Sequence, residues 1–247
     1  MKLRMANSSR YHLVLLPGLD GGGHLFEPLL SVLPSTFEAS VVQFPADRPL
    51  SHRDMFGCIR SVIPWDRPYV VVAESSAGPI ALKFVEAQRQ NIQAVVLCAS
   101  FVTNPVATAS VTNPLKWATS LISKPWYERA ITPELVREHL LGGDAPDILV
   151  ERTTESLRAL TPAVWSSRIQ TVLGADARQE LLDCEKPILY LQAAGDKFVT
   201  SAALDEIRRL KPSVKTAVVK GPHAVLQRNP RESIEAIRSF LDSLPTI

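Results

Sequence analysis

Two adjacent serines, Ser75 and Ser76, follow the apolar, β-branched run VVVAE and precede a helical pattern. A serine on a tight turn between a strand and a helix projects its hydroxyl above the sheet, where it can attack a carbonyl carbon. Such a turn needs small residues two positions before and two positions after the nucleophile. Ser75 has Ala73 and Ala77 at these positions, whereas Ser76 has the bulky Glu74 before it. The pattern favours Ser75 over Ser76 as a nucleophile, while the motif alone fits an ordinary serine-containing turn equally well.

A serine nucleophile also needs a base that takes its proton and a carboxylate that holds the base. Asp196 follows the apolar run at residues 188–193, and His223 follows the run at residues 216–219. Both loops would lie beyond the carboxyl ends of strands, where ligands bind in open α/β sheets. We therefore expect Ser75, Asp196 and His223 to meet above one edge of a sheet. The other four histidines are placed less well for this role: His12, His24, His52 and His139.

A glycine-rich loop, LPGLDGGGH, follows the first apolar run. Glycines let backbone N–H groups approach a substrate, so we expect Gly18 to line a binding site. A phosphate-binding loop would need G-x-G-x-x-G or G-x-x-x-x-G-K-[ST], and neither spacing fits here. His24 at the end of this loop could line the pocket, but a solvated loop position is the better interpretation.

Short apolar runs alternate with helical patterns along most of the chain. Runs of this kind are typical of strands buried on both faces of a parallel sheet, and we predict six of them, at residues 12–16, 40–44, 69–73, 94–99, 188–193 and 216–219. Helical patterns occupy residues 25–32, 55–63, 79–90, 201–210 and 233–244. This alternation predicts an α/β fold with a doubly wound, mostly parallel sheet.

Residues 104–185 interrupt the alternation, because they contain no convincing strand. The segment shows helical signatures instead, and it includes Trp117, Trp126 and Trp165. We therefore predict a core domain of residues 1–103 and 186–247, with residues 104–185 as a helical insertion over the carboxyl ends of the strands. The insertion has 8 Lys and Arg and 11 Asp and Glu residues, a net charge of −3.

The composition excludes several other classes of protein. The chain has 247 residues and a formal net charge of +2, too small to indicate nucleic acid as a partner. Its three cysteines form no metal-binding spacing, which favours a reduced, cytoplasmic protein. The short apolar stretch near the N-terminus does not fit a signal peptide, and no window is long enough for a membrane span. The sequence leaves a homodimer open.

With these motifs the chain resembles the α/β-hydrolase superfamily, and its serine carboxylesterases in particular. The family's Gly-x-Ser-x-Gly appears here as AESSA, with alanine at both glycine positions. The resemblance implies a nucleophile–acid–base order of Ser75, Asp196 and His223. It also implies that the backbone N–H groups of Leu19 and Ser76 form the oxyanion hole. No metal or organic cofactor is implied.

The resemblance implies a serine hydrolase that cleaves a carboxylic ester of a small or medium acyl or aromatic substrate through an acyl-enzyme. A thioesterase or a cofactor-free perhydrolase would use the same triad, and a non-catalytic binding protein of this fold is a further alternative. The insertion resembles an esterase lid, so Trp117, Trp126 and Trp165 could contact substrate or could pack within the lid. The negative charge of the insertion disfavours docking of an acidic acyl carrier protein.

Overall fold

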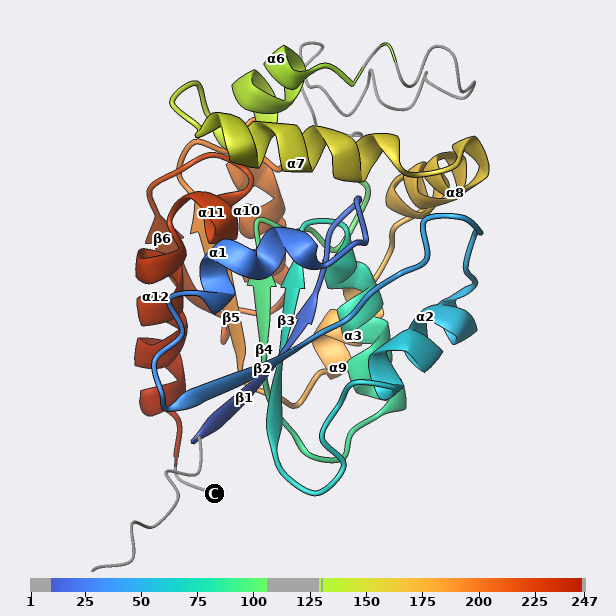
Figure 1. Ribbon diagram of the computed structural model, residues 1–247. Coiled ribbons are helices and arrows are strands. Elements are labelled where there is room, and N and C mark those ends of the chain that lie inside the picture. The colour runs from blue at the N-terminus through green and yellow to red at the C-terminus, as the bar shows by residue number, and fades with distance from the viewer. Residues whose placement is uncertain (1–9, 106–128, 130, 246–247) are drawn as a thin grey trace, which may run out of the picture.

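The computed structural model describes residues 10–105, 129 and 131–245. The described residues form one sheet of six parallel strands in the order β2-β1-β3-β4-β5-β6 (Figure 1). The strands are β1 (Tyr11–Leu16), β2 (Phe37–Val41), β3 (Tyr69–Glu74), β4 (Ile92–Cys98), β5 (Ile188–Ala193) and β6 (Lys215–Val219). The predicted α/β fold with a parallel sheet is confirmed.

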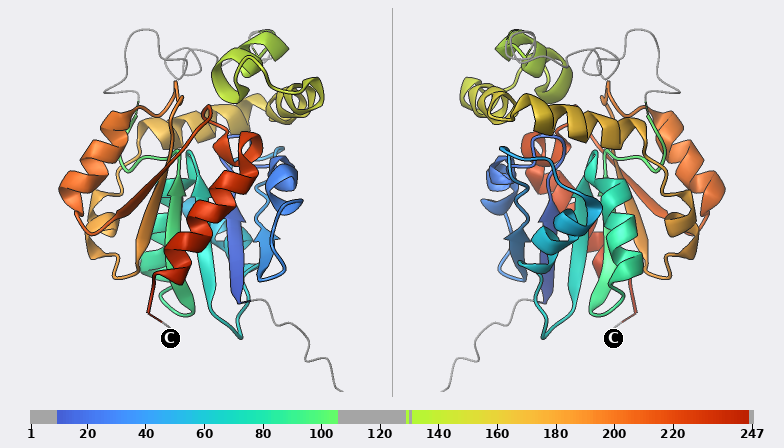
Figure 2. Two further views of the ribbon diagram at one scale, coloured as in Figure 1. Left: turned by 90° about the vertical axis from the view of Figure 1, so that its left-hand side faces the viewer. Right: turned by 90° about the vertical axis from the view of Figure 1, so that its right-hand side faces the viewer.

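Helices cover both faces of this sheet (Figure 2). One face carries α2 (His52–Arg60), α3 (Ala77–Ala87), α9 (Arg178–Asp183) and α10 (Ser201–Leu210). The other face carries the 3-10 turn η1 (His24–Phe26), α1 (Glu27–Leu30), α11 (Val225–Arg228) and α12 (Pro230–Asp242). The sheet is therefore the middle of three layers, and its two faces border two separate apolar clusters.

The alternation of side chains along each strand explains the two clusters. In β3, Val71 and Ala73 face the cluster under α2 and α3, while Val70 and Val72 face the cluster under α1 and α12. Successive side chains of a strand point to opposite faces, so a central strand of a three-layer fold must be apolar throughout. This is why the runs in the sequence are continuous, with no polar residue at every second position.

The second strand begins and ends three residues earlier than the predicted range of 40–44. β2 lies at the edge of the sheet, and only Phe37 of its residues is buried; Glu38 is exposed and the other three are partly buried. An edge strand with one solvated side has a weaker apolar signal than a central strand. The strongly apolar Val42 and Phe44 come after the strand and are buried beneath the loop that follows β1.

Four helices lie beyond the carboxyl ends of the strands, above the sheet in Figure 1. They are α6 (Pro133–Leu135), the π-helix η2 (Val136–Leu141), α7 (Asp147–Arg158) and α8 (Pro162–Leu173). Their apolar side chains form a cluster of their own around Val150 and Trp165. By contrast, α9 packs on the sheet layer, where Leu181 is fully buried. The division into a core and an insertion at residues 104–185 stays a prediction.

Candidate active site

Two loops lie where the strand order reverses, that is, where the chain stops adding strands on one side of β1 and begins adding them on the other side. β1 is followed by β2 on one side, and β3 lies on the other side of β1. Ligands of open α/β sheets bind at such a switch point, beyond the carboxyl ends of the strands. The loop that begins at Pro17 and the turn at Ser75 both lie there, and Gly18 approaches Ser75 so closely that an added Cβ would meet the Ser75 Cβ at 3.3 Å.

Ser75 lies on a strained turn between β3 and α3. Its backbone φ is 52°, in the left-handed region that a residue with a side chain rarely adopts. Ser100 holds this turn, because its Oγ donates a 2.6 Å hydrogen bond to the Ser75 carbonyl oxygen. Gly78 allows the contact, since an added Cβ would lie 1.9 Å from the Ser100 Oγ. The turn therefore presents the Ser75 hydroxyl above the sheet.

The three residues of the predicted triad are connected by hydrogen bonds. Ser75 Oγ lies 2.8 Å from His223 Nε2, and His223 Nδ1 lies 2.8 Å from Asp196 Oδ2. The second oxygen of Asp196 accepts hydrogen bonds from the backbone N–H groups of Phe198 (2.8 Å) and Val199 (2.9 Å). The side chains of His223 and Asp196 are shielded from water, with exposed fractions of 9% and 3%. The carboxylate is thus fixed by its own loop and oriented toward the imidazole.

Arg168 of α8 fastens the glycine-rich loop beside Ser75. Its guanidinium donates to the Leu19 carbonyl oxygen at 2.7 Å and to the carbonyl oxygens of Phe44 and Pro45 at 3.2 and 2.9 Å. Gly21 has a φ of 67°, and an added Cβ there would collide with this guanidinium. The Arg168 contacts therefore link α8 to the loop that carries Gly18 and Leu19.

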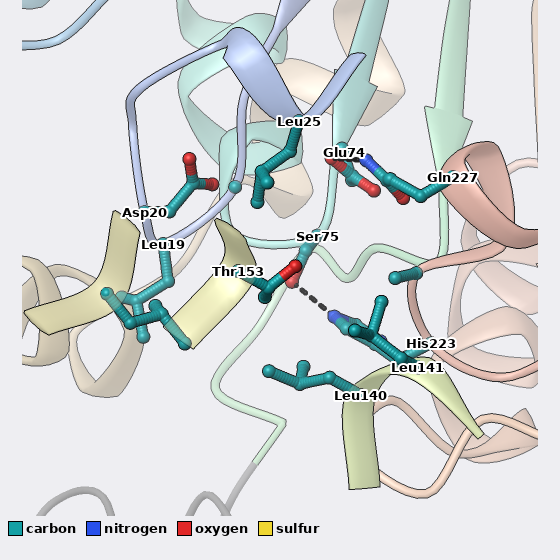
Figure 3. Close-up of a pocket in the computed structure, with 13 residues that line it drawn as sticks. Leu19, Asp20, Leu25, Glu74, Ser75, Leu140, Leu141, Thr153, His223 and Gln227 are labelled. Carbon is teal, nitrogen blue, oxygen red and sulfur yellow. Dashed lines mark hydrogen bonds between the residues drawn. The ribbon is translucent and has the colours of Figure 1, made fainter. Parts of the chain in front are cut away.

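A cavity of about 80 Å³ opens beside Ser75 and His223 (Figure 3). Its apolar wall comes mainly from leucines of the glycine-rich loop, η1, η2 and α7: Leu19, Leu25, Leu140, Leu141 and Leu157. Its polar wall contains Asp20, Glu74 and Gln227. The cavity therefore lies between the sheet edge and the helices above it, and it reaches the Ser75 hydroxyl.

The comparisons with known proteins agree with this architecture. No family model matches the sequence. A pimeloyl-[acyl-carrier protein] methyl ester esterase from Neisseria meningitidis serogroup A is 25% identical over 242 residues, which is 93% of this chain and 76% of that protein. The biotin biosynthesis bifunctional protein BioHC from Cellvibrio japonicus is 31% identical over 83 residues, and that match covers 33% of this chain but only 16% of the larger protein.

Solved structures share the whole fold. The esterase RhEst1 from Rhodococcus sp. ECU1013 aligns with a TM-score of 0.78 and 16% identity, covering 95% of this chain and 91% of that chain. The chain has the α/β-hydrolase fold. A bromoperoxidase from Bacillus anthracis aligns equally well with this chain, at a TM-score of 0.78 and 16% identity over 96% of this chain and 93% of the other. The esterases among these proteins support hydrolase activity.

Two ionisable groups of the α/β-hydrolase site have shifted pKa values. Burial alone would lower the pKa of His223, but the charge and hydrogen bond of Asp196, together with the charge of Glu74, raise it above the ordinary 6.5. Burial, followed by the charge of Asp20, raises the pKa of Glu74 from 4.5 to about 7, against the opposing effects of His223 and Gln227. A raised pKa for His223 means that its protonated form is stabilised, as a base that accepts a proton from Ser75 requires.

Three of the predicted binding residues lie away from the cavity or outside the described part of the chain. Trp165 is 4% exposed and packs in the apolar cluster of α7 and α8, and it is not among the residues that line the cavity. Trp117 and Trp126 lie outside the described residues. Gly18 and Leu19 line the cavity, and Ser76 immediately precedes α3.

Sequence reasoning missed four polar residues of the site: Asp20, Glu74, Arg168 and Gln227. Each of them has a side-chain or backbone partner more than 100 residues away in the sequence, so no local motif marks them. Only Glu74 had a signal in the sequence. It is the last residue of an apolar strand and directly precedes the candidate nucleophile, so its carboxylate could be expected to be buried beside the site. Within the described ranges, no group of three or more His, Cys, Asp and Glu residues is arranged to hold a metal ion. None of the described helices has the length and apolar character needed to cross a membrane.

Proposed function

We propose that this α/β-hydrolase cleaves carboxylic esters with Ser75 as nucleophile, His223 as general base and Asp196 as the residue that orients the base. The observation that carries the proposal is the continuous pair of 2.8 Å hydrogen bonds from Ser75 through His223 to Asp196. A nucleophile within hydrogen-bond reach of a base, which a third group orients in turn, is the arrangement that acyl transfer needs.

In the first half of the reaction, the Ser75 Oγ attacks the ester carbonyl carbon while His223 Nε2 takes the hydroxyl proton. Asp196 accepts the Nδ1–H of the imidazole, which keeps the lone pair of Nε2 toward Ser75 and stabilises the imidazolium. The backbone N–H groups of Leu19 and Ser76 would bind the oxyanion of the tetrahedral intermediate. His223 then gives its proton to the departing alkoxide, and the acyl group stays on Ser75.

In the second half, water takes the place of the alcohol. His223 removes a proton from the water, and the resulting attack forms a second tetrahedral intermediate at the same carbonyl carbon. Collapse of this intermediate returns the proton to the Ser75 oxygen and releases the carboxylic acid. The strained backbone at Ser75 and the Arg168 contacts to the glycine-rich loop would hold the nucleophile and oxyanion donors in place through both halves.

The size of the cavity favours a short acyl group. A cavity of 150 Å³ holds benzene, so about 80 Å³ accommodates roughly half as many heavy atoms. We expect kcat/KM for p-nitrophenyl esters to be highest for acetate to butanoate and to fall at least about tenfold by octanoate, because longer chains must displace leucines of η2 and α7. Steady-state assays over this series test the proposed function. Absence of ester hydrolysis by the folded protein would refute it.

The acid limb of the pH profile gives a second test. Only neutral His223 accepts the Ser75 proton, so kcat/KM should rise with pH and reach half its maximum at the pKa of His223. We expect this midpoint above the ordinary histidine value of 6.5, because Asp196 and Glu74 stabilise the imidazolium. Glu74→Gln removes one of these charges and should move the midpoint to lower pH.

A matched control separates this effect from a general change in surface charge. Glu232 lies on α12, away from the cavity, so Glu232→Gln should leave the midpoint where it is in the wild type. The measurement is kcat/KM for p-nitrophenyl acetate between about pH 5 and 9, the range in which histidine titrates. An acid limb that does not move in Glu74→Gln would contradict the electrostatic coupling of Glu74 with His223.

A further inference from the structure

Three polar side chains form a cluster in the cavity wall that the proposed mechanism does not use. They are Asp20 and Glu74, each 8% exposed, and Gln227, which is 6% exposed. They come from the glycine-rich loop, the end of β3 and α11, and all three line the cavity next to Ser75. In Figure 3, Glu74 and Gln227 lie on one side of Ser75, and Leu140, Leu141 and His223 lie on the other.

The cluster is rich in acceptors and poor in positive charge. Glu74 receives one hydrogen bond from Gln227 Nε2, at 3.2 Å. Asp20 Oδ2 receives hydrogen bonds from the backbone N–H of Gly22 at 2.9 Å and from Ser156 Oγ at 3.2 Å. Among the residues that line the cavity, none is a lysine or arginine. Both carboxyl groups are buried, and the hydrogen bonds that they receive come from neutral donors. Burial, followed by the charge of Asp20, raises the pKa of Glu74 to about 7.

A second observation points to a missing hydrogen-bond donor. Gln227 Oε1 is buried, and it has no hydrogen-bond partner among the described residues. A buried acceptor without a partner costs about 1–3 kcal/mol, so native proteins rarely retain one without a use for it. Because Gln227 lines the cavity, a bound molecule could supply the donor to this oxygen.

We propose that Asp20, Glu74 and Gln227 form a subsite for an ammonium group carried by the ester substrate a few bonds from its carbonyl carbon. The inference rests on the proposed ester hydrolysis and specifies its substrate class. An ammonium bears several N–H donors and a positive charge. It can therefore donate to Gln227 Oε1 and to a carboxylate while it neutralises the negative charge that Asp20 and Glu74 concentrate. A substrate with a carboxylate at this place would be repelled.

Four methyl esters of similar shape test the subsite: methyl 3-aminopropanoate, methyl 3-hydroxypropanoate, methyl butanoate and monomethyl succinate. They present an ammonium, a hydroxyl, a methyl and a carboxylate group at equivalent positions. Titration of the released acid at constant pH gives kcat/KM for each ester. The assay pH is set just above the pKa of Glu74, where the amine of the ammonium ester is still protonated. We expect the ammonium ester to exceed methyl butanoate by at least about tenfold, as a charged hydrogen bond of about 1.5–3 kcal/mol predicts.

Variants are compared by the ratio of kcat/KM for the ammonium ester to that for methyl butanoate, because a general loss of activity cancels in this ratio. Glu74→Gln should reduce the ratio at least about tenfold. Gln227→Met, which keeps the side-chain length but removes the amide, should also reduce it. Gln179→Met on α9 is the matched control, and its ratio should equal that of the wild type. In the wild type the ratio should also rise with pH near 7, as Glu74 loses its proton.

The results separate this inference from the function on which it rests. Hydrolysis of methyl butanoate with a ratio near or below one in the wild type would overturn the subsite and leave the ester hydrolase intact. A hydroxyl ester that is hydrolysed as well as the ammonium ester would also overturn it, because charge would then have no role. If the protein hydrolyses neither the four methyl esters nor any p-nitrophenyl ester, both the subsite and the proposed ester hydrolysis are overturned.

Discussion

Ser75→Ala should lower kcat for p-nitrophenyl acetate by roughly 10⁶-fold, which is the scale seen when the serine of such a triad is removed. The substitution removes the oxygen that forms the acyl-enzyme in the proposed mechanism, while the proposed oxyanion donors and the cavity remain. Those remaining groups can still give a rate of about 10³–10⁴ over water. Steady-state kinetics with a blank for spontaneous hydrolysis measures the loss.

The fold should survive this substitution, because alanine adopts the positive φ of Ser75 at about the same cost as serine. Thermal unfolding and far-UV circular dichroism check this point. Ser31→Ala, at an exposed serine after α1, is the matched control and should keep the wild-type rate. Retention of more than about a hundredth of the wild-type kcat in Ser75→Ala would show that another nucleophile performs the reaction.

Asp196→Asn should lower kcat by about 10⁴-fold with little change in the folded structure. Asp196 accepts the Nδ1–H of His223 at 2.8 Å, so the carboxylate selects the tautomer whose Nε2 is free to take the Ser75 proton. An asparagine amide in its place can donate to Nδ1 instead, and the Nε2 position then carries the hydrogen. The loss should appear in kcat, because the cavity that binds the ester is unchanged.

Asp205→Asn provides the matched control for the carboxylate. Asp205 is an exposed residue of α10, and its replacement should leave kcat within about twofold of the wild type. Asp196→Asn with more than about a tenth of the wild-type kcat would contradict the role assigned to the carboxylate. A loss of binding with kcat unchanged would contradict it as well, since Asp196 does not line the cavity.

The fold could be predicted from the sequence because its central strands are buried on both faces. The runs around Val71 and Val95 are apolar at every position, as is typical of strands buried on both faces of a parallel sheet. The edge strand β2 was predicted three residues late for the opposite reason. It faces solvent along one side, so its position is set by pairing with β1 rather than by its own hydrophobicity.

The candidate nucleophile was predictable because its constraint is local. The turn at Ser75 needs small neighbours at Ala73 and Ala77, and both are buried. Those alanines replace the family's glycines, and the tight contact is instead at Gly78, which passes next to Ser100. Asp196 and His223 were predictable because loops beyond parallel strands converge at one edge of the sheet, whatever their separation in the chain.

The remaining parts of the site depend on contacts that a sequence does not display. Arg168 reaches the glycine-rich loop from α8, almost 150 residues later in the chain. Gln227 meets Glu74 across 153 positions. Trp165 is a large aromatic residue of the kind that can contact a substrate, but the packing of α7 and α8 buries it in their own apolar cluster. In each case the three-dimensional packing of the helices decides the role of the side chain.

The most direct test of the account is covalent labelling of the native protein with a fluorophosphonate, followed by peptide mapping by mass spectrometry. An activated serine attacks the phosphorus, expels fluoride and keeps the phosphonyl group on its Oγ. The account predicts one adduct, on Ser75, which is absent in Ser75→Ala and forms far more slowly in His223→Ala. An adduct on Ser76, or a folded protein that takes up no label, would contradict it.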